Sequence, residues 1–242
     1  MTEKIAILID SCSDAPQYLQ DKEYVKTVSM QIHWDGKVLR DRVDITPDQF
    51  YRKIKRGSSI PTTSSPQSGD ILEKFQELEK EGYSDVIAIC ISSGLSTTYN
   101  QISLLASQQS KLNIKVIDTK NIGIGSGLFA VYADDLIKKQ LPFSKIVKLV
   151  EESVDNGKIF FYIPTLKYLA AGGRIGKVAS ILGSALDIKP IISCNDQGVY
   201  YTVTKARGER KTIEKMLALV EKTVALKKRL ELPLPKAIIR HF

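Results

Sequence analysis

Hydroxyl side chains gather in two stretches of this sequence, each just before a pattern that predicts a helix. One stretch is "SSGLSTTYN", residues 92–100, and the other is "TTSSPQSGD", residues 62–70. Ser96 and Ser65 are the expected N-caps, with Pro66 as the first helical residue after Ser65. Because a helix start has unpaired amide N–H groups and a partial positive charge, hydroxyls there could help to hold an anion. Simple capping is the alternative interpretation of both stretches, since serine and threonine cap helices more often than they bind ligands.

A nucleophilic serine is a third interpretation, and it requires a general base within reach. The chain has two histidines, His33 and His241. In addition, "SSGLS" lacks the glycines that lie two residues on either side of the serine in a nucleophile elbow. The stretch "GIGSG" at residues 123–127 lacks the Lys-Ser/Thr of a phosphate-binding P-loop. The sequence therefore favours an anion-binding or capping role over a Ser–His hydrolase.

Two arginines lie beside glycines. Arg174 stands between glycines in "AAGGRIGK", residues 170–177, where its guanidinium could hold a carboxylate through two parallel hydrogen bonds. The alternative is a helix that ends at the paired glycines and is followed by a surface arginine. Arg207 in "TKARGER" follows a predicted hairpin, and its alternative is a place in the first turn of a basic helix.

Composition limits the classes of protein that fit. The 242-residue chain has a formal net charge of +8, and residues 205–230 contain nine Lys or Arg and three Glu. No aromatic side chains alternate with these cations, so a solvated helix face is favoured over nucleic-acid binding. No apolar run approaches the ~20 residues of a membrane-spanning helix, and the start "MTEKIAILID" leads directly into a strand-like run, so we expect no signal peptide. Three isolated cysteines predict reduced thiols rather than disulfides or a metal site: Cys12, Cys90 and Cys194.

Short apolar runs alternate with helical patterns in the first half of the chain, which is typical of a parallel α/β sheet with crossover helices. The predicted strands are residues 4–10, 25–34, 85–92 and 114–118. The predicted helices are residues 46–57, 65–82, 123–140 and 143–156, with one more that runs through Gln101 to about Gln109.

Ligands of such sheets bind beyond the carboxyl ends of the strands. Polar residues follow three of the predicted strands at this edge, namely Asp10 and Ser11, the loop from Ser92 to Ser96, and Asp118 and Thr119. We therefore expect a ligand site at this edge of the sheet.

The pattern changes after Gly157, which predicts a domain boundary there. Residues 188–204 predict a β-hairpin that turns at Asn195–Gly198, and a long basic helix follows it. The other elements expected in this half are strands at 158–163 and 236–242 and short helices at 164–173 and 176–183.

Seven motifs occur in an order and at a spacing that resemble the DegV family of fatty-acid-binding proteins: "ILIDSCSDAP", "TTSSP", "ISSGLSTTYNQ", "VIDTK", "AAGGRIGK", "DIKPII" and "KARG". The resemblance covers nearly all of the chain. It implies an α/β fold of two α/β domains that bury a single long-chain fatty acid between them. Residues 1–157 would form the first domain, with a mostly parallel sheet, and residues 158–242 a smaller second domain with a mixed sheet.

The resemblance also implies the site residues. The family's carboxylate-binding threonine and serine fall on Thr63 and Ser96. The other residues expected at the carboxylate are Ser64, Ser93, Gly94 and Arg174, and the arginine associated with a partner kinase falls on Arg207.

The chain departs from the family pattern at three places. Ser65 stands where the family has glutamine, and Thr97 stands where it has the glycine after the cradle serine. A side chain at position 97 is expected to crowd the headgroup or shift the loop. Family members also continue beyond residues 236–242 with a helix, a strand and a His-Thr-Gly loop near the headgroup, so we expect the second domain to lack one wall of the site.

The function implied by the resemblance is that of a non-catalytic carrier in the bacterial cytoplasm. It would present the acyl carboxylate to a separate ATP-using fatty acid kinase, and the acyl phosphate would pass to phospholipid synthesis. The expected ligand is a long-chain fatty acid, with no cofactor, metal or nucleic-acid partner and with transient membrane contact left open. Two alternatives are a small hydrolase or phospho-ligand enzyme that uses the same Ser/Thr loops, and a scaffold that has lost lipid binding.

Overall fold

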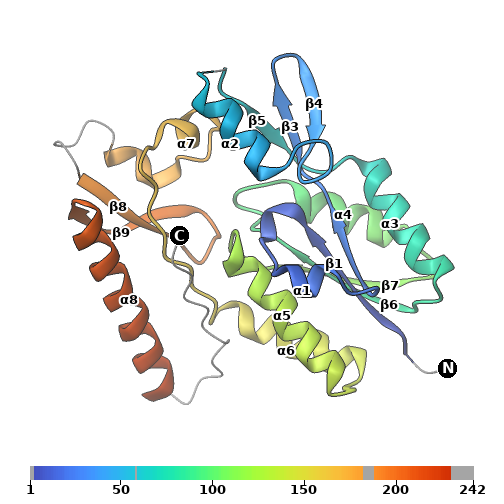
Figure 1. The fold of residues 1–242 in the computed structure, drawn as a ribbon. Helices are drawn as coiled ribbons and strands as arrows, with labels where there is room; N and C mark the ends of the chain where they lie inside the picture. The colour runs from blue at the N-terminus through green and yellow to red at the C-terminus, as the bar shows by residue number, and fades with distance from the viewer. Residues whose placement is uncertain (1–2, 58, 182–187, 230–242) are drawn as a thin grey trace.

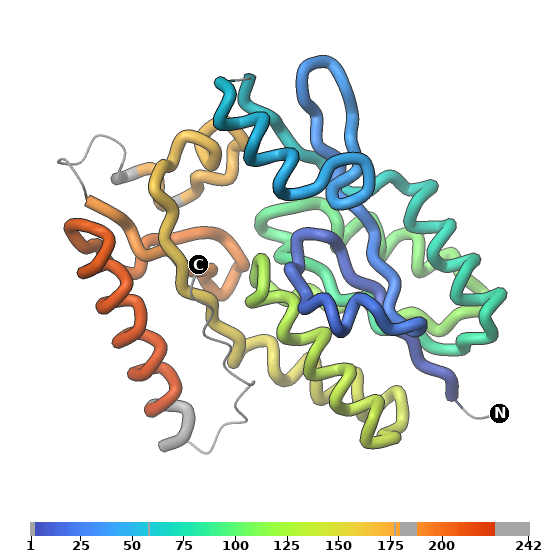
Figure 2. Tube along the Cα trace, in the orientation of Figure 1, coloured from blue at the N-terminus to red at the C-terminus, as the bar shows by residue number. Residues whose placement is uncertain are grey.

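A computed structural model describes residues 3–57, 59–181 and 188–229. The strand predicted at 236–242 lies outside the described residues. Figure 1 shows two units, a larger one built around a sheet and a smaller one that begins after α6 and ends in the long helix α8 (Glu209–Arg229). In the tube view of Figure 2, α8 and the first residues of β1 lie at opposite ends of the molecule.

The larger unit contains the parallel sheet that the sequence predicts. Its four strands run in the order β2-β1-β6-β7, and every pair is parallel, with Ile5 opposite Asp85 at the start of β1 and β6. The central strands are almost entirely buried, which explains their continuous apolar sequences. The bounds are β1 Ile5–Asp10, β2 Val25–Val28, β6 Asp85–Cys90 and β7 Asn113–Asp118.

Helices cover both faces of this sheet (Figure 1). Successive side chains of a strand point to opposite faces, so Ile7 and Ile9 of β1 join one core cluster, whereas Ala6 and Leu8 join the other. The first cluster packs against α5 (Ile124–Lys138) and α6 (Phe143–Val154), and the second against α3 (Ser68–Lys80) and α4 (Thr98–Ser107). A short helix, α1 (Gln17–Gln20), and a 3-10 turn at Ser11–Ser13 complete the first crossover.

The single strand predicted at 25–34 is wrong, because the chain changes sheets within it. β2 ends at Val28, and β3 (Gln31–Trp34) belongs to a separate antiparallel sheet of order β4-β3-β5. The Ser11 hydroxyl accepts a hydrogen bond from the amide of Met30 at the break, 3.1 Å away. The other two strands of this small sheet, β4 (Lys37–Arg40) and β5 (Thr62–Ser64), were not predicted.

An Asp-Gly turn and a capped helix hold the small sheet together. Asp35 and Gly36 join β3 to β4 with φ values of 49° and 75°, which is the backbone that favours Asp-Gly in two-residue hairpins. The predicted helix at 46–57 is α2 (Pro47–Lys55), and Thr46 and Gln49 form a capping box at its start. Its Phe50 packs on Trp34 of β3, with ring centroids 4.9 Å apart.

The smaller unit contains the predicted hairpin. Strands β8 (Ile188–Cys194) and β9 (Tyr200–Arg207) pair antiparallel, and Gly198 has a φ of +71° in the turn between them. Among the described residues this antiparallel pair is the sheet of the smaller unit. The short helices are α7 (Lys167–Ala171) and a 3-10 helix at Gly176–Ile181.

The strand predicted at 158–163 is wrong, because the segment makes a single bridge, between Phe161 and Ile192. Its continuous run of apolar side chains does not reflect a ladder of backbone hydrogen bonds. Ile159, Phe161 and Ile163 instead pack into the apolar cluster of the smaller unit. Packing of an extended segment thus produced the short apolar run that predicts a strand.

Asp134 of α5 is a buried charge on which the larger unit depends, with a side chain that is 1% exposed. It accepts hydrogen bonds from Lys22 Nζ and Tyr24 Oη, both at 2.5 Å, and from Lys138 Nζ at 2.8 Å. We expect Asp134→Asn to lower the free energy of unfolding by about 3 kcal/mol, because it breaks a buried charge pair. Lys138→Gln is the matched control, and since Lys138 is 54% exposed it should cost less than about 1 kcal/mol. Urea unfolding measures both, and equal losses would contradict the assignment.

The same carboxylate predicts a pH dependence of stability. Burial by itself raises the pKa of Asp134, but the hydrogen bonds from Lys138, Lys22 and Tyr24 outweigh it and hold the pKa below its ordinary value. The stabilisation is therefore complete above the unfolded pKa of roughly 3.9 and is lost as the pH falls through the lower folded value. The difference in unfolding free energy between wild type and Asp134→Asn should shrink in that acid range.

Candidate functional site

The carboxyl ends of β1 and β6 are joined by a buried carboxylate. Asp10 is 0% exposed, and it accepts hydrogen bonds from the amides of Cys12 at 3.0 Å and Ile91 at 2.8 Å. Burial raises the pKa of Asp10 to about 7, and these two backbone bonds act against that rise. Asp10 therefore fixes the backbone just before Ser92, where the loop of hydroxyl residues begins.

The hairpin turn of the smaller unit is seated on Ser92. The Ser92 hydroxyl, 0% exposed, donates to the carbonyl of Gly198 at 2.8 Å and accepts from the amide of Gly94 at 3.0 Å. A Cβ on Gly198 would lie 1.8 Å from Ser92 Oγ, and one on Gly94 would lie 2.6 Å from the carbonyl oxygen of Gln197. The turn and the loop after β6 are therefore in close backbone contact, and both glycines are required by it.

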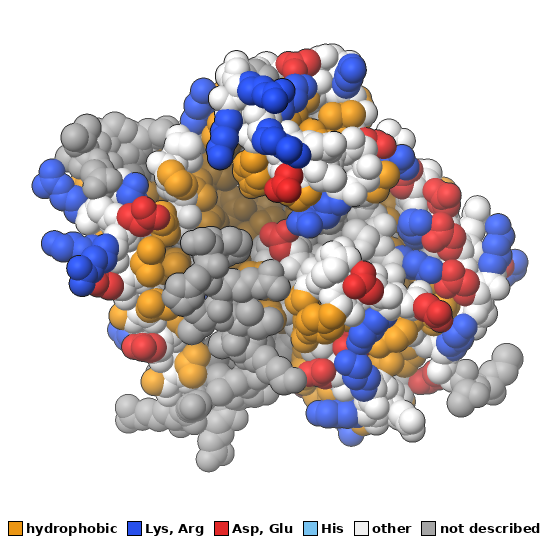
Figure 3. All heavy atoms as spheres, in the orientation of Figure 1, with side chains coloured by type: hydrophobic (Ala, Val, Ile, Leu, Met, Phe, Trp, Pro, Cys, Tyr) orange, Lys and Arg blue, Asp and Glu red, His pale blue; other side chains and the backbone are white. Residues whose placement is uncertain are grey.

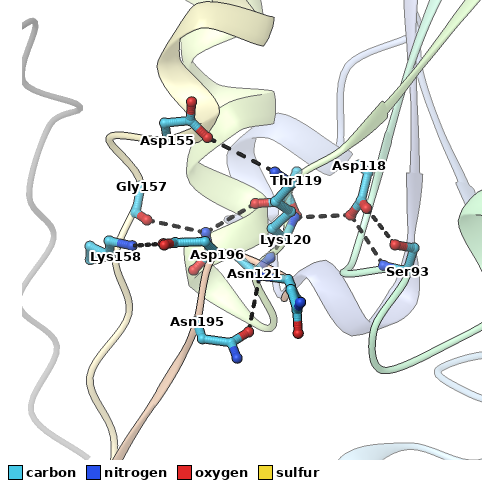
Figure 4. Close-up of polar contacts among 11 residues, drawn as sticks. Ser93, Asp118, Thr119, Lys120, Asn121, Asp155, Gly157, Lys158, Asn195 and Asp196 are labelled. Atoms are coloured by element: carbon cyan, nitrogen blue, oxygen red, sulfur yellow. Dashed lines mark hydrogen bonds and ion pairs between the residues drawn. The ribbon is translucent and has the colours of Figure 1, made fainter. Parts of the chain in front are cut away.

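Two further polar contacts lie at this seam between the units, one within the smaller unit and one that joins the two units, as Figure 4 shows. Lys158 Nζ lies 3.3 Å from Asp196 in the hairpin turn, and Asn121 Nδ2 donates to the carbonyl of Gly157 at 3.4 Å. The polar residues after β7 thus lie against the hairpin turn and the segment that leads out of α6. Gly157, after which the sequence pattern changes, lies at this seam.

Ser93 is engaged by a carboxylate of the chain itself. Its hydroxyl donates to Asp118 Oδ2 at 2.5 Å and its amide donates to Asp118 Oδ1 at 3.1 Å (Figure 4). Ser93 would have to leave Asp118 before its hydroxyl could reach a bound carboxylate.

Ser96 stands at the start of α4. Its side chain accepts the amide of Thr98 at 3.3 Å, which is a local bond from the backbone two residues on to a serine hydroxyl. The helix itself begins at Thr98, with Thr97 before it making no side-chain cap bond. Within the described part of the chain, the amides of Thr97, Tyr99 and Asn100 have no acceptor in hydrogen-bond geometry. The prediction that Ser96 is the N-cap of α4 is therefore wrong by one residue, because Thr97 occupies that position. The N–H groups at the start of the helix remain available to an anion.

The two hydroxyl-rich stretches are brought together. Thr97 Oγ1 donates to Ser65 Oγ at 3.2 Å, and Gln101 Nε2 donates to the carbonyl of Pro66 at 2.9 Å and to Ser68 Oγ at 3.0 Å. The prediction that Ser65 caps a helix beginning at Pro66 is wrong, because α3 begins at Ser68 after Gln67. Residues 62–64 pair with β3 instead, which extends the chain past the expected start of the helix.

Thr63 and Ser64 lie next to each other in β5, so their side chains point to opposite faces. Thr63 is exposed and pairs with Ile32. The Ser64 hydroxyl lies 2.8 Å from Nε2 of His33. A carboxylate bound on one face of β5 can therefore be reached by only one of these two side chains.

Arg174 and Arg207 differ in their relation to the site. Arg174 Nε donates to the carbonyl of Leu95 at 3.2 Å, and Nη1 donates to the carbonyl of Gly172 at 2.6 Å. Arg174 is thus brought to the loop that holds Ser96, where it binds backbone. Arg207 is exposed at the end of β9, opposite Ile188.

Apolar side chains line the seam beside this loop. Leu95 packs in a cluster with residues of the smaller unit, and seven members of the cluster are only partly buried. In Figure 3 a hollow lies beside α2, and hydrophobic side chains form its floor. The cluster consists of Leu95, Val178, Ile192, Cys194 and Tyr200, with Ile122, Ile159, Phe161, Ile163, Leu166, Leu169 and Ile175 partly buried around them.

Three further findings bear on the class of site. Among the described residues, no three His, Cys, Asp or Glu side chains gather as a metal site would require. The helices in this part of the chain include none with the length and apolar character needed to cross a bilayer. All three cysteines are free thiols.

Sequence reasoning placed Ser92 in the site loop and Gly198 in the hairpin turn without predicting their contact, and it assigned no role to Thr98. Ser92 and Thr98 are buried polar side chains at the site loop, and Gly198 is the residue on which the loop rests. The available signal was the Asn-Asp-Gln-Gly turn at 195–198, which predicts a hairpin but not the surface that it contacts.

The seat of the hairpin turn predicts a contrast between two glycines. Gly198→Ala places a methyl group on Ser92, whereas Gly36→Ala, at a similar φ of +75°, meets nothing within 4 Å. Both variants carry the strain of a positive φ, and we expect Gly198→Ala to cost about 2 kcal/mol more in unfolding free energy, because of the clash. Thermal and urea unfolding would check this, and equal losses would show that the turn is not seated on Ser92.

A family model and the similar proteins of known sequence agree on one family. The model of the DegV family, which is described as uncharacterised, matches residues 4–235. A DegV domain-containing protein of Clostridium acetobutylicum is 37% identical over 225 residues, which cover 93% of this chain and 80% of that protein.

Solved structures agree with this assignment. A fatty-acid-binding DegV family protein from Thermus thermophilus superposes with a TM-score of 0.82 at 29% identity, covering 91% of this chain and 78% of that one. A stearic-acid-binding protein from Eubacterium ventriosum gives 0.84 at 27% identity, with 93% and 78% covered. The chain belongs to the DegV family.

Proposed function

We propose that this protein binds a long-chain fatty acid, with the carboxylate at the N-terminus of α4 and the acyl chain along the apolar seam between the two units. The proposal rests on the residues at the start of α4. Ser96, just before the helix, is 9% exposed, and it lies beside amides that meet no acceptor among the described residues. A buried hydroxyl together with free N–H groups can hold a carboxylate without a cationic side chain.

The apolar cluster around Leu95 supports the second half of the proposal. It begins one residue before Ser96, so a carboxylate at α4 would have its alkyl chain directed toward partly buried side chains such as Ile159 and Phe161. Each CH₂ group that leaves water contributes about 0.8 kcal/mol. The similar proteins from Thermus thermophilus and Eubacterium ventriosum are described as binding fatty acid and stearic acid.

The finer role that we propose is that of a non-catalytic carrier in the cytoplasm. A separate fatty acid kinase would phosphorylate the carboxylate with ATP, and the acyl phosphate would supply phospholipid synthesis. A neutral cradle suits this role, because no cation would withdraw charge from the oxygen that must attack. Arg207, exposed at the end of β9, is the residue that we assign to the kinase contact, while Thr63 and Ser96 hold the headgroup.

Oleate binding tests this function. Purified protein should carry a stoichiometric fatty acid in native mass spectrometry, or take up added oleate after delipidation. Thr63→Ala with Ser96→Ala should weaken binding about tenfold or more, since hydrogen bonds to a charged group contribute about 1.5–3 kcal/mol. Ser107→Ala, at the far end of α4, is the control and should bind like wild type. A delipidated protein that takes up no oleate would exclude the proposal.

A small hydrolase is a second candidate, and one contact favours it. His33 Nε2 lies 2.8 Å from Ser64 Oγ, which places a base within reach of a hydroxyl nucleophile. No described residue bonds the other ring nitrogen of His33, so none of them orients the ring as the third member of a triad would.

Hydrolysis of p-nitrophenyl esters separates the two candidates. A Ser–His hydrolase should show turnover that His33→Gln and Ser64→Ala each abolish. The carrier should show no turnover that depends on His33, and His33→Gln should leave its oleate affinity within about twofold of wild type.

A further inference from the structure

A hydrogen-bond chain runs behind Ser96 into the core. Thr98, the first residue of α4, is 0% exposed, and Met30 is 4% exposed. Thr98 Oγ1 lies 2.8 Å from Ser96 Oγ and donates to the sulfur of Met30 at 3.5 Å. The amide of Thr98 donates to the same Ser96 oxygen at 3.3 Å. Ser96 is thus contacted from behind by two groups of one residue.

The contacts with Thr98 limit the hydrogen bonds that the Ser96 hydroxyl can donate. A hydroxyl has one proton to donate and two lone pairs to accept with. The sulfur of Met30 can only accept, so when Thr98 donates to it the proton between the two hydroxyls must come from Ser96. In this state Ser96 has no proton left for a ligand.

We propose that Thr98 is a positioning residue for the carboxylate site and that its hydroxyl changes acceptor when an acid binds. This inference rests on the fatty-acid site proposed above. The Thr98 proton turns from Met30 to Ser96 Oγ, which then accepts the amide and the hydroxyl of Thr98 and donates its own proton to the carboxylate. No covalent bond changes, and Ser96 reaches its full complement of three hydrogen bonds.

The thioether of Met30 keeps the free-energy cost of this exchange small. Sulfur of methionine is a weak acceptor, so the bond that Thr98 gives up is weak, whereas the bond that Ser96 gains is to a charged oxygen. A hydroxyl that accepts two hydrogen bonds is also a better donor, because hydrogen bonds in a chain polarise one another. Thr98 is fully buried behind Ser96, so it acts through Ser96.

Affinities for oleate and for oleyl alcohol test this role. Thr98→Val keeps the shape and the amide but removes the hydroxyl, and we expect it to weaken oleate binding about fivefold. Oleyl alcohol lacks the carboxylate, so its affinity should change less than about twofold. Thr98→Ser should restore the oleate affinity. A general packing defect would instead weaken both ligands, and that result would overturn the positioning role.

A double-mutant cycle shows whether Thr98 acts through Ser96. In a Ser96→Ala background, Thr98→Val should have no further effect on oleate binding, whereas independent effects would multiply. Met30→Leu, a volume-conserving change, provides a variant that keeps Thr98. It leaves the Thr98 proton with Ser96 as its acceptor, so oleate should bind at least as tightly as to wild type.

The two possible failures can be told apart. If wild-type protein takes up no oleate, the fatty-acid function fails and the role of Thr98 fails with it. If wild type binds oleate and Thr98→Val binds it equally well, with unchanged thermal unfolding, only the role of Thr98 is wrong. Oleate binding weakened by Met30→Leu, or independent effects in the cycle, would also overturn it.

Discussion

The contact between Ser92 and the hairpin turn is the constraint on which the site depends. A single buried hydroxyl at the end of β6 donates to the carbonyl of Gly198 at 2.8 Å and accepts the amide of Gly94 at 3.0 Å. It therefore sets the position of the smaller unit and of the site loop at once. Arg174 adds a second tie from the smaller unit, through the carbonyl of Leu95. The residue that follows Leu95 is Ser96, so both units determine where the cradle lies.

The edge of the parallel sheet explains why so many side chains bond backbone here. Strands that end together leave amides and carbonyls without ladder partners, and buried groups of this kind must be satisfied. Asp10 meets the amides of Cys12 and Ile91, and Thr119 donates to the carbonyl of Cys90 at 2.8 Å. These bonds fix the loops, so the free amides of α4 are held in place without being used up.

The sequence predicts the parts of this fold that depend on local pattern. The apolar runs of β1, β6 and β7, the capped helix α2 and the hairpin at 188–204 all follow from residues close together in the chain. The break between β2 and β3 could not be predicted in the same way. Residues 28–34 alternate across the break, and the change of sheet coincides with a contact from the distant Ser11, whose hydroxyl accepts the amide of Met30. Periodicity reports which side chains are buried, but not which strand is the neighbour.

The site residues, like the elements of the fold, could be predicted only where the signal is local in the sequence. Ser96 could be found because a serine before a helix is a local signal, whereas Ser92, Thr98 and Gly198 gain their roles from contacts across long stretches of chain. Thr97 illustrates the difference. The resemblance to the family implies a glycine at this position, and a side chain there is expected to crowd the headgroup or shift the loop. The Thr97 hydroxyl bonds Ser65 at 3.2 Å. Two residues that are distant in the sequence thus meet in space, and the contact gives the Thr97 hydroxyl a partner in the neighbouring loop.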